Sequence, residues 1–266
     1  MPRSAGDIRH FIIAGALIAI GTGVMYWLLD TVLALPVEAS RQASVVDGVV
    51  NLHLILIAFL FSLVVVFMLY SVVAFRRRPG DDGDGEHFEG HSLLEVVWTV
   101  VPLIVVVIFG YIGIVTLNDI TQAAPNEVKV NVTGFQWSWS FEYPEDGFLS
   151  TELVLPVDRQ ARMLMNSRDV IHSFWIPEMR MKQDLVPGKE TTLVFTPTLI
   201  GEYKLRCAEL CGLSHYSMLA TVRIVSQEDY DAWLADQSAS VTPEEPDTAL
   251  VKAAPAVQNG ASTSNN

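Results

Sequence analysis

Three long apolar runs constrain the fold of this chain more than any other feature. They cover residues 11–29, 49–75 and 93–117, and they account for a hydrophobic content of 50% over 266 residues. At about 1.5 Å per helical residue, the first run would extend roughly 28 Å and the second about 40 Å, and the bilayer core is about 30 Å thick. We therefore predict that the second and third runs form a transmembrane helical hairpin.

The first run has two interpretations. It follows Arg3 and Arg9 and precedes the small residues around Val37-Glu38-Ala39, as in a cleaved secretory signal peptide. It is long for such a peptide, so a retained signal anchor is the alternative, and we favour cleavage. The predicted divisions of the chain are a signal peptide or anchor (1–39), a helical hairpin (40–120), a β domain (121–237) and a disordered tail (238–266).

Basic residues orient the hairpin. Arg76, Arg77 and Arg78 directly follow the second run, which places that end in the cytoplasm by the positive-inside rule. The third run then leads outward, so everything after Asn118 lies outside. The formal net charge of -13 argues against nucleic acid as a partner, because a polyanion would be repelled.

From Glu127 onward the apolar pattern changes to alternation typical of strands. Turn signals such as Pro144-Glu145-Asp146-Gly147 separate the short segments, which indicates a β-sandwich or barrel. In a strand over 135–143, Phe135, Trp137, Trp139 and Phe141 would share one face. A short capped helix is expected after Ser226. The predicted strands cover 128–133, 135–143, 152–155, 191–195, 202–206 and 219–225.

A cluster of metal-binding residue types lies between the last two predicted strands. Cys207, Cys211, His215 and Met218 form a Cys-x3-Cys-x3-His-x2-Met pattern. Thiolate, imidazole and thioether together select copper over magnesium or calcium. A one-copper electron-transfer site uses one Cys, so two thiolates would suit a pair of bridged copper ions. Such a site needs a second imidazole, and His172, in an apolar run, is the candidate.

Two other interpretations of the cysteines are open. Two cysteines in an exported domain most often form a disulfide. Two Cys and two His also make a zinc site. The spacing of His215 and Met218, with His172 upstream, disfavours both interpretations.

With these motifs the chain resembles subunit II of the haem-copper cytochrome c oxidases, over roughly residues 50 to 235. The resemblance implies a membrane-anchored, cupredoxin-like Greek-key β-sandwich carrying the dinuclear copper centre CuA. It also implies that Glu209 contributes its backbone carbonyl to copper and its carboxylate to a magnesium ion at the subunit I boundary. The implied copper ligands are His172, Cys207, Glu209, Cys211, His215 and Met218.

The resemblance implies roles for three further residues. Trp137, in Gly134-Phe135-Gln136-Trp137, would be the point of electron entry. Glu95 would lie near the entry of a proton path, although a first-turn acid favoured by the helix dipole explains it as well. Asp184 would lie near subunit I, or it is a simple turn acid.

The expected function is electron transfer within a respiratory oxidase of the bacterial plasma membrane. Cytochrome c would supply electrons to the copper pair on the outer side, and haem in subunit I would receive them for O2 reduction coupled to proton translocation. Subunits I and III would be partners. No Cys-x-x-Cys-His is present, so we expect a separate donor, steered by acids such as Glu142, Glu145 and Asp146. The alternatives are a quinol oxidase subunit II, a copper carrier, a nitrous oxide reductase copper domain and a structural anchor.

Overall fold

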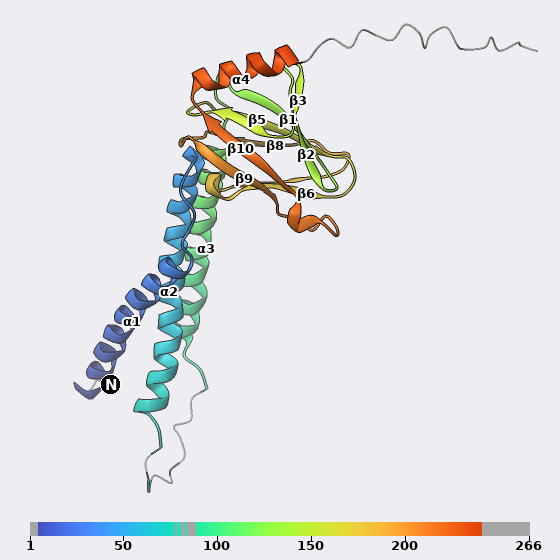
Figure 1. The fold of residues 1–266 in the computed structure, drawn as a ribbon. Coiled ribbons are helices and arrows are strands. Elements are labelled where there is room, and N and C mark those ends of the chain that lie inside the picture. Colours follow the sequence, from blue (N-terminus) through green and yellow to red (C-terminus); the bar gives the residue numbers. More distant parts are fainter. Residues whose placement is uncertain (1–4, 78, 81–82, 84–88, 241–266) are drawn as a thin grey trace, which may run out of the picture.

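The chain forms three long helices that lead to a β domain at one end (Figure 1). The computed structural model describes residues 5–77, 79–80, 83 and 89–240. The helices are α1 (Ala5–Val32), α2 (Arg41–Ala74) and α3 (Ser92–Ile120). Each contains a segment long and apolar enough to cross a membrane. The predicted helical hairpin followed by a β-sandwich is confirmed.

Side-chain caps define where two of these helices begin. The Ser40 hydroxyl accepts a hydrogen bond from the Ala43 N–H at the start of α2, and the His91 ring accepts one from Leu94 at the start of α3. These bonds satisfy backbone N–H groups that have no partner inside the helix. In the described part of the chain α3 has no buried residue, so its apolar surface is available to lipid or to other subunits.

The β domain is a sandwich of two five-stranded sheets. One sheet has the order β3-β2-β1-β5-β8 and the other β4-β10-β9-β6-β7. The pairs β1/β5 and β4/β10 are parallel and the rest are antiparallel, so strands distant in sequence lie side by side. The strands are β1 (Val128–Phe135), β2 (Ser138–Tyr143), β3 (Phe148–Ser150), β4 (Leu153–Pro156), β5 (Ala161–Ser167), β6 (His172–Ile176), β7 (Met181–Leu185), β8 (Thr191–Phe195), β9 (Gly201–Cys207) and β10 (Leu219–Val225).

Large aromatic side chains fill the space between the sheets. Trp139, Phe141 and Phe174 are at most 2% exposed. The buried Tyr143 hydroxyl donates to the Val154 carbonyl and accepts from the Val154 N–H, each at 2.8 Å, and so joins β2 to β4 of the other sheet. Helix α4 (Gln227–Ser240) covers the end of the sandwich that lies away from the membrane helices (Figure 1).

The structure corrects several predicted segments. A single strand over 135–143 is wrong, because the chain reverses at Gln136-Trp137 and Phe135 pairs with Ser138. The four aromatic residues therefore do not share one face: Trp139 and Phe141 are buried, whereas Trp137 is exposed. The strands β3, β5, β6 and β7 were not predicted. The predicted tail begins within α4, and its residues 241–266 lie outside the described part.

Candidate metal centre

The loop between β9 and β10 is held in place by backbone hydrogen bonds at both ends. The Cys207 N–H donates to the Met218 carbonyl at 3.1 Å, which closes the loop. The Ala208 N–H donates to the Ser173 backbone carbonyl of β6 at 3.0 Å, which fixes the loop beside the strand that carries His172. A short 3-10 turn, His215–Ser217, returns the chain to β10. The loop therefore brings its own side chains to His172.

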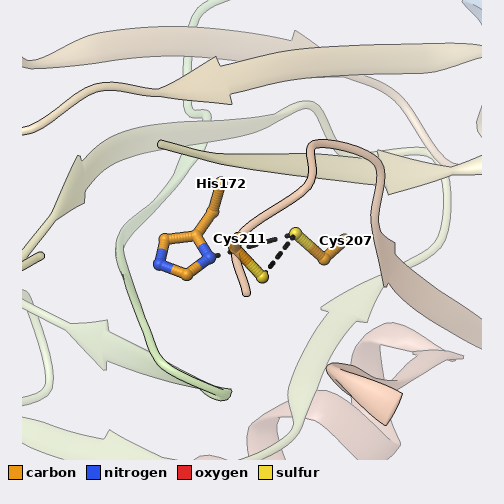
Figure 2. A group of neighbouring side chains, drawn as sticks. All are labelled: His172, Cys207 and Cys211. Carbon is orange, nitrogen blue, oxygen red and sulfur yellow. Dashed lines mark hydrogen bonds between the residues drawn. The ribbon is translucent and has the colours of Figure 1, made fainter. Parts of the chain in front are cut away.

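His172, Cys207 and Cys211 converge on one point (Figure 2). Both cysteines are free thiols, with their sulfur atoms 3.8 Å apart. The His172 Nδ1 lies 3.9 Å from the Cys207 Sγ. One ligand atom from each residue lies within 4.8 Å of the others, as expected for a group that could hold a metal.

The remaining predicted ligands complete this cluster. The His215 Nδ1 lies 3.5 Å from the Cys211 Sγ, and the Met218 Sδ lies 3.7 Å from the same sulfur. The Glu209 carbonyl oxygen lies 3.3 Å from the Cys207 Sγ. Each thiol thus has one imidazole nitrogen beside it, and a thioether and a carbonyl lie at the margins. All six predicted ligand positions come together in one place.

The donor atoms of this cluster are largely buried and suit a soft cation. His172 and Cys211 are 0% and 3% exposed. Burial and the neighbouring Cys207 thiol raise the pKa of the Cys211 thiol to about 11. A bound cation would favour the thiolate over the thiol, so metal binding displaces a proton here. Two thiols, two imidazoles and a thioether fit copper by their softness.

Asp169 holds the His172 ring. Its Oδ1 lies 2.8 Å from the His172 Nε2, and its Oδ2 accepts the Gln136 N–H at 2.7 Å. Although burial opposes ionisation, hydrogen bonds from the Gln136 N–H and from His172 lower the pKa of Asp169 to about 2. A carboxylate only accepts, so Nε2 carries the proton and Nδ1 keeps its lone pair toward Cys207. Sequence reasoning missed this role, and the signal was an Asp three residues before His172.

Trp137 lies at the surface against the same loop. It is 38% exposed. Gly212 approaches it so closely that a Cβ there would lie 3.3 Å from the Trp137 Nε1 and 2.7 Å from the Gln136 Nε2. The Gln136 amide also donates to the Cys211 carbonyl at 2.6 Å. The hairpin turn of β1 and β2 is therefore tied directly to the metal loop.

The other residues singled out from the sequence lie apart from the cluster. Glu95 lies in the first turn of α3, at the end of the helices that is remote from the sandwich (Figure 1). Asp184 is bonded to Lys182 and Ser173, which lower its pKa, and Ser173 directly follows His172. Glu142 pairs in register with Asn131, toward the far end of β2 from Trp137.

Comparisons with known proteins agree with this arrangement. A family model described as cytochrome c oxidase subunit II, transmembrane domain, matches residues 26–115, and one described as its periplasmic domain matches residues 148–225. A cytochrome c oxidase subunit 2 of Synechocystis is 32% identical over 83% of this chain and 81% of its own. One of Thermostichus vulcanus is 32% identical over 83% of this chain and 84% of its own.

One solved structure is also similar to part of this chain. The crystal structure of the periplasmic domain of cytochrome oxidase subunit II from Bradyrhizobium japonicum covers 46% of this chain and 100% of its own, with 26% identity and a TM-score of 0.43.

Proposed function

This chain belongs to the cytochrome c oxidase subunit II family, and from that premise we propose that it binds the dinuclear copper centre CuA and transfers electrons through it. Cytochrome c would donate electrons on the outer side of a bacterial plasma membrane, and haem in subunit I would receive them from the copper centre. Subunit III would complete the complex, which reduces O2 and translocates protons. The proposed ligands are His172, Cys207, Cys211, His215, Met218 and the Glu209 carbonyl.

One observation carries this proposal: two free thiols lie 3.8 Å apart, and each has an imidazole Nδ1 beside it. The two thiols and two imidazoles alone would also suit zinc, but a zinc site has no place for a thioether, and the Met218 sulfur lies 3.7 Å from the Cys211 sulfur. When bound, the copper pair would accept and release one electron at a time.

The protein's contribution is a rigid set of ligands. His172 is fixed by Asp169 and packed edge-on against Trp139, whose ring centroid is 6.2 Å away. Met218 is 0% exposed, and its carbonyl is bonded to the Cys207 N–H. Because these side chains are held by packing and hydrogen bonds, they would move little between oxidation states. Electron transfer would then need little rearrangement.

Electron entry is proposed at Trp137. It is exposed and contacts the loop through Gly212. Leu210, Leu213 and Tyr216 of the same loop are 79% to 87% exposed, so the surface around the cluster is apolar. An exposed apolar surface of this kind suits contact with another protein. A docked cytochrome would thus meet Trp137 and the loop together.

Two further roles are proposed for acidic residues. Glu209 is exposed, and its carboxylate would bind magnesium against subunit I. Glu95, exposed in the first turn of α3, would lie near the entry of a proton path. A first-turn acid favoured by the helix dipole remains the alternative for Glu95.

The test is the copper content and electron paramagnetic resonance spectrum of the full-length chain, purified in detergent and loaded with copper. We expect two coppers per chain sharing one unpaired electron, and the loss of this signal in Cys207→Ser and in Cys211→Ser. Ser226→Ala, outside the cluster, serves as the control. A single ordinary cupric signal, or a Cys207–Cys211 disulfide in the loaded protein, would contradict the proposal and favour a carrier or a structural role.

A further inference from the structure

We infer that α1 stays in the mature subunit as a third membrane helix and is not removed as a leader. Its apolar span, Ile8–Val32, has 25 residues. The apolar region of a cleaved signal peptide has about 7 to 15. The inference does not depend on the proposed electron transfer, because it rests on contacts of α1 and of the segment that follows it.

Helix α1 packs closely along α2 through small residues. Ala14 of α1 and Ala58 and Ser62 of α2 are at most 5% exposed. A Cβ on Gly21 would lie only 3.3 Å from both the Cβ and the Oγ of Ser62. Small residues at such positions allow the backbones of two membrane helices to approach closely. A leader that is discarded has no need for a surface matched to α2.

Two polar contacts fix the register of the antiparallel pair. Near the N-terminal end of α1, the His10 Nδ1 lies 2.7 Å from the Tyr70 hydroxyl oxygen. Nearer the C-terminal end of α1, the Tyr26 hydroxyl donates to the Asn51 Oδ1 at 2.8 Å. Each contact gives a polar side chain near one end of α1 a partner on α2, so each favours the packed arrangement.

The segment after α1 is built into the β-sandwich, and we call residues 36–42 the strap. The Ala39 N–H donates to the Glu178 carbonyl, and the Ala39 carbonyl accepts from the Thr198 N–H, both at 2.9 Å. Ala39 and Ser40 are 0% and 3% exposed. Further bonds of the strap are Arg180 Nη2 to the Pro36 carbonyl (2.5 Å), Ser40 Oγ to the Met179 carbonyl (2.8 Å), the Arg41 N–H to the Thr196 carbonyl (2.9 Å) and the Thr196 N–H to Gln42 Oε1 (2.9 Å).

The small residues that suggested cleavage lie inside this strap. A cut after Ala39 would create a new ammonium group on Ser40, which is buried against the sandwich. Burying a charge without a partner is costly. The cut would also separate α1 from the segment that joins it to the sandwich. The buried strap thus disfavours a cut at Ala39, and the contacts of α1 with α2 favour keeping the helix joined to the strap.

The first experiment measures the intact mass of the full chain, purified from a bacterial membrane with its partner subunits. We expect residues 1–39 to be present. In parallel, the pair Gly21→Cys with Ser62→Cys is oxidised in the membrane and compared with Gly15→Cys with Ser62→Cys. The Cβ separation of 3.3 Å at Gly21 is close to the range for a disulfide, about 3.5 to 4.5 Å, whereas nothing lies within 4 Å of a Cβ on Gly15.

We expect the Gly21 pair to form a disulfide and the Gly15 pair, which has the same number of cysteines, to form little or none. A chain that begins at Ser40, or equal crosslinking of the two pairs, would overturn the inference.

A matched pair of substitutions tests the contact without added cysteines. Gly21→Leu should lower the midpoint of thermal unfolding of the complex, whereas Gly23→Leu, where nothing lies within 4 Å, should leave it unchanged. Equal midpoints for the two variants would also overturn the inference. Neither substitution touches the copper ligands, so a loss of copper is a separate result that bears only on the proposed function.

Discussion

At the scale of single residues, the contact with the greatest consequence is the one between Asp169 and His172. The carboxylate fixes which imidazole nitrogen faces the thiols, and its other oxygen holds the Gln136 N–H. Asp169→Asn keeps the size of the side chain and removes the charge. We expect copper affinity to fall about 10- to 100-fold, as is typical when a partner of a metal-binding His is lost. Competition with a copper chelator measures this, and Glu190→Gln, at an exposed position, is the control.

An unchanged affinity together with an unchanged spectrum in Asp169→Asn would show that packing alone orients the His172 ring.

Gly134 controls the space beside the same ring. A Cβ there would lie 3.2 Å from both the His172 Cδ2 and the Leu185 Cδ2. Contacts this tight force side chains to shift, at a cost of about 1 to 3 kcal/mol. For Gly134→Ala we therefore expect a lower unfolding free energy and altered visible absorption of the copper-loaded chain. Ser138→Ala, exposed in the same hairpin, should change neither, and a normal spectrum in Gly134→Ala would count against this role for Gly134.

At the scale of elements, the Tyr143 hydroxyl links the two sheets. In Tyr143→Phe both the N–H and the carbonyl of Val154 lose their partner inside the core. A buried polar group without a partner costs about 1 to 3 kcal/mol. We expect an unfolding free energy lower by about 2 kcal/mol at neutral pH, within that range, measured by urea unfolding with tryptophan fluorescence. Tyr216→Phe, at an 84% exposed position, is the matched control.

The same hydroxyl makes stability depend on alkaline pH. Burial raises the pKa of Tyr143 well above 10. Above pH 10 the unfolded chain loses this proton and the folded chain keeps it, so stability falls as pH rises, by up to about 1.4 kcal/mol per pH unit. Urea titrations between pH 8 and 11 should therefore show a shallower decline in Tyr143→Phe than in Tyr216→Phe. Parallel declines would refute a contribution from Tyr143.

At the scale of the whole molecule, the net charge of -13 predicts an electrostatic effect on the donor. In the assembled oxidase, kcat/KM with a basic cytochrome c should fall about tenfold or more between low and high salt. Glu145 lies beyond the end of β2 that is far from Trp137. At 0.1 M salt, charges separated by more than about 10 Å are largely screened from each other. Glu145→Gln should therefore have little effect by itself, although the sequence suggested Glu145 as one of the steering acids. Turnover that does not respond to salt would rule out steering.

The parts of the molecule that could be predicted from the sequence are those that a local pattern of residues determines. The long apolar runs determine the helices, and the ligand spacing in the Cys207–Met218 loop determines the cluster. Sequence reasoning failed where strands lack β-branched residues, as in β5, with its methionines, and β7. The reversal at Gln136-Trp137 contains no Gly, Pro or Asn to signal a turn. Asp169 and the strap depend on contacts across the fold, which a one-dimensional pattern does not contain.

The strap also has a consequence for the order in which the subunit is assembled. Its hydrogen-bond partners lie at least 139 positions later in the chain, as Met179 does from Ser40, and Thr196 lies 154 positions after Gln42. When α1 and α2 have left the ribosome, the strap therefore emerges outside the membrane with no partner, and it waits until β6 to β8 have been translocated. The join between membrane and β domain is thus among the last parts to close. Destabilising substitutions in residues 177–198 should accordingly make the strap sensitive to protease in nascent chains before they cause any defect in the helices.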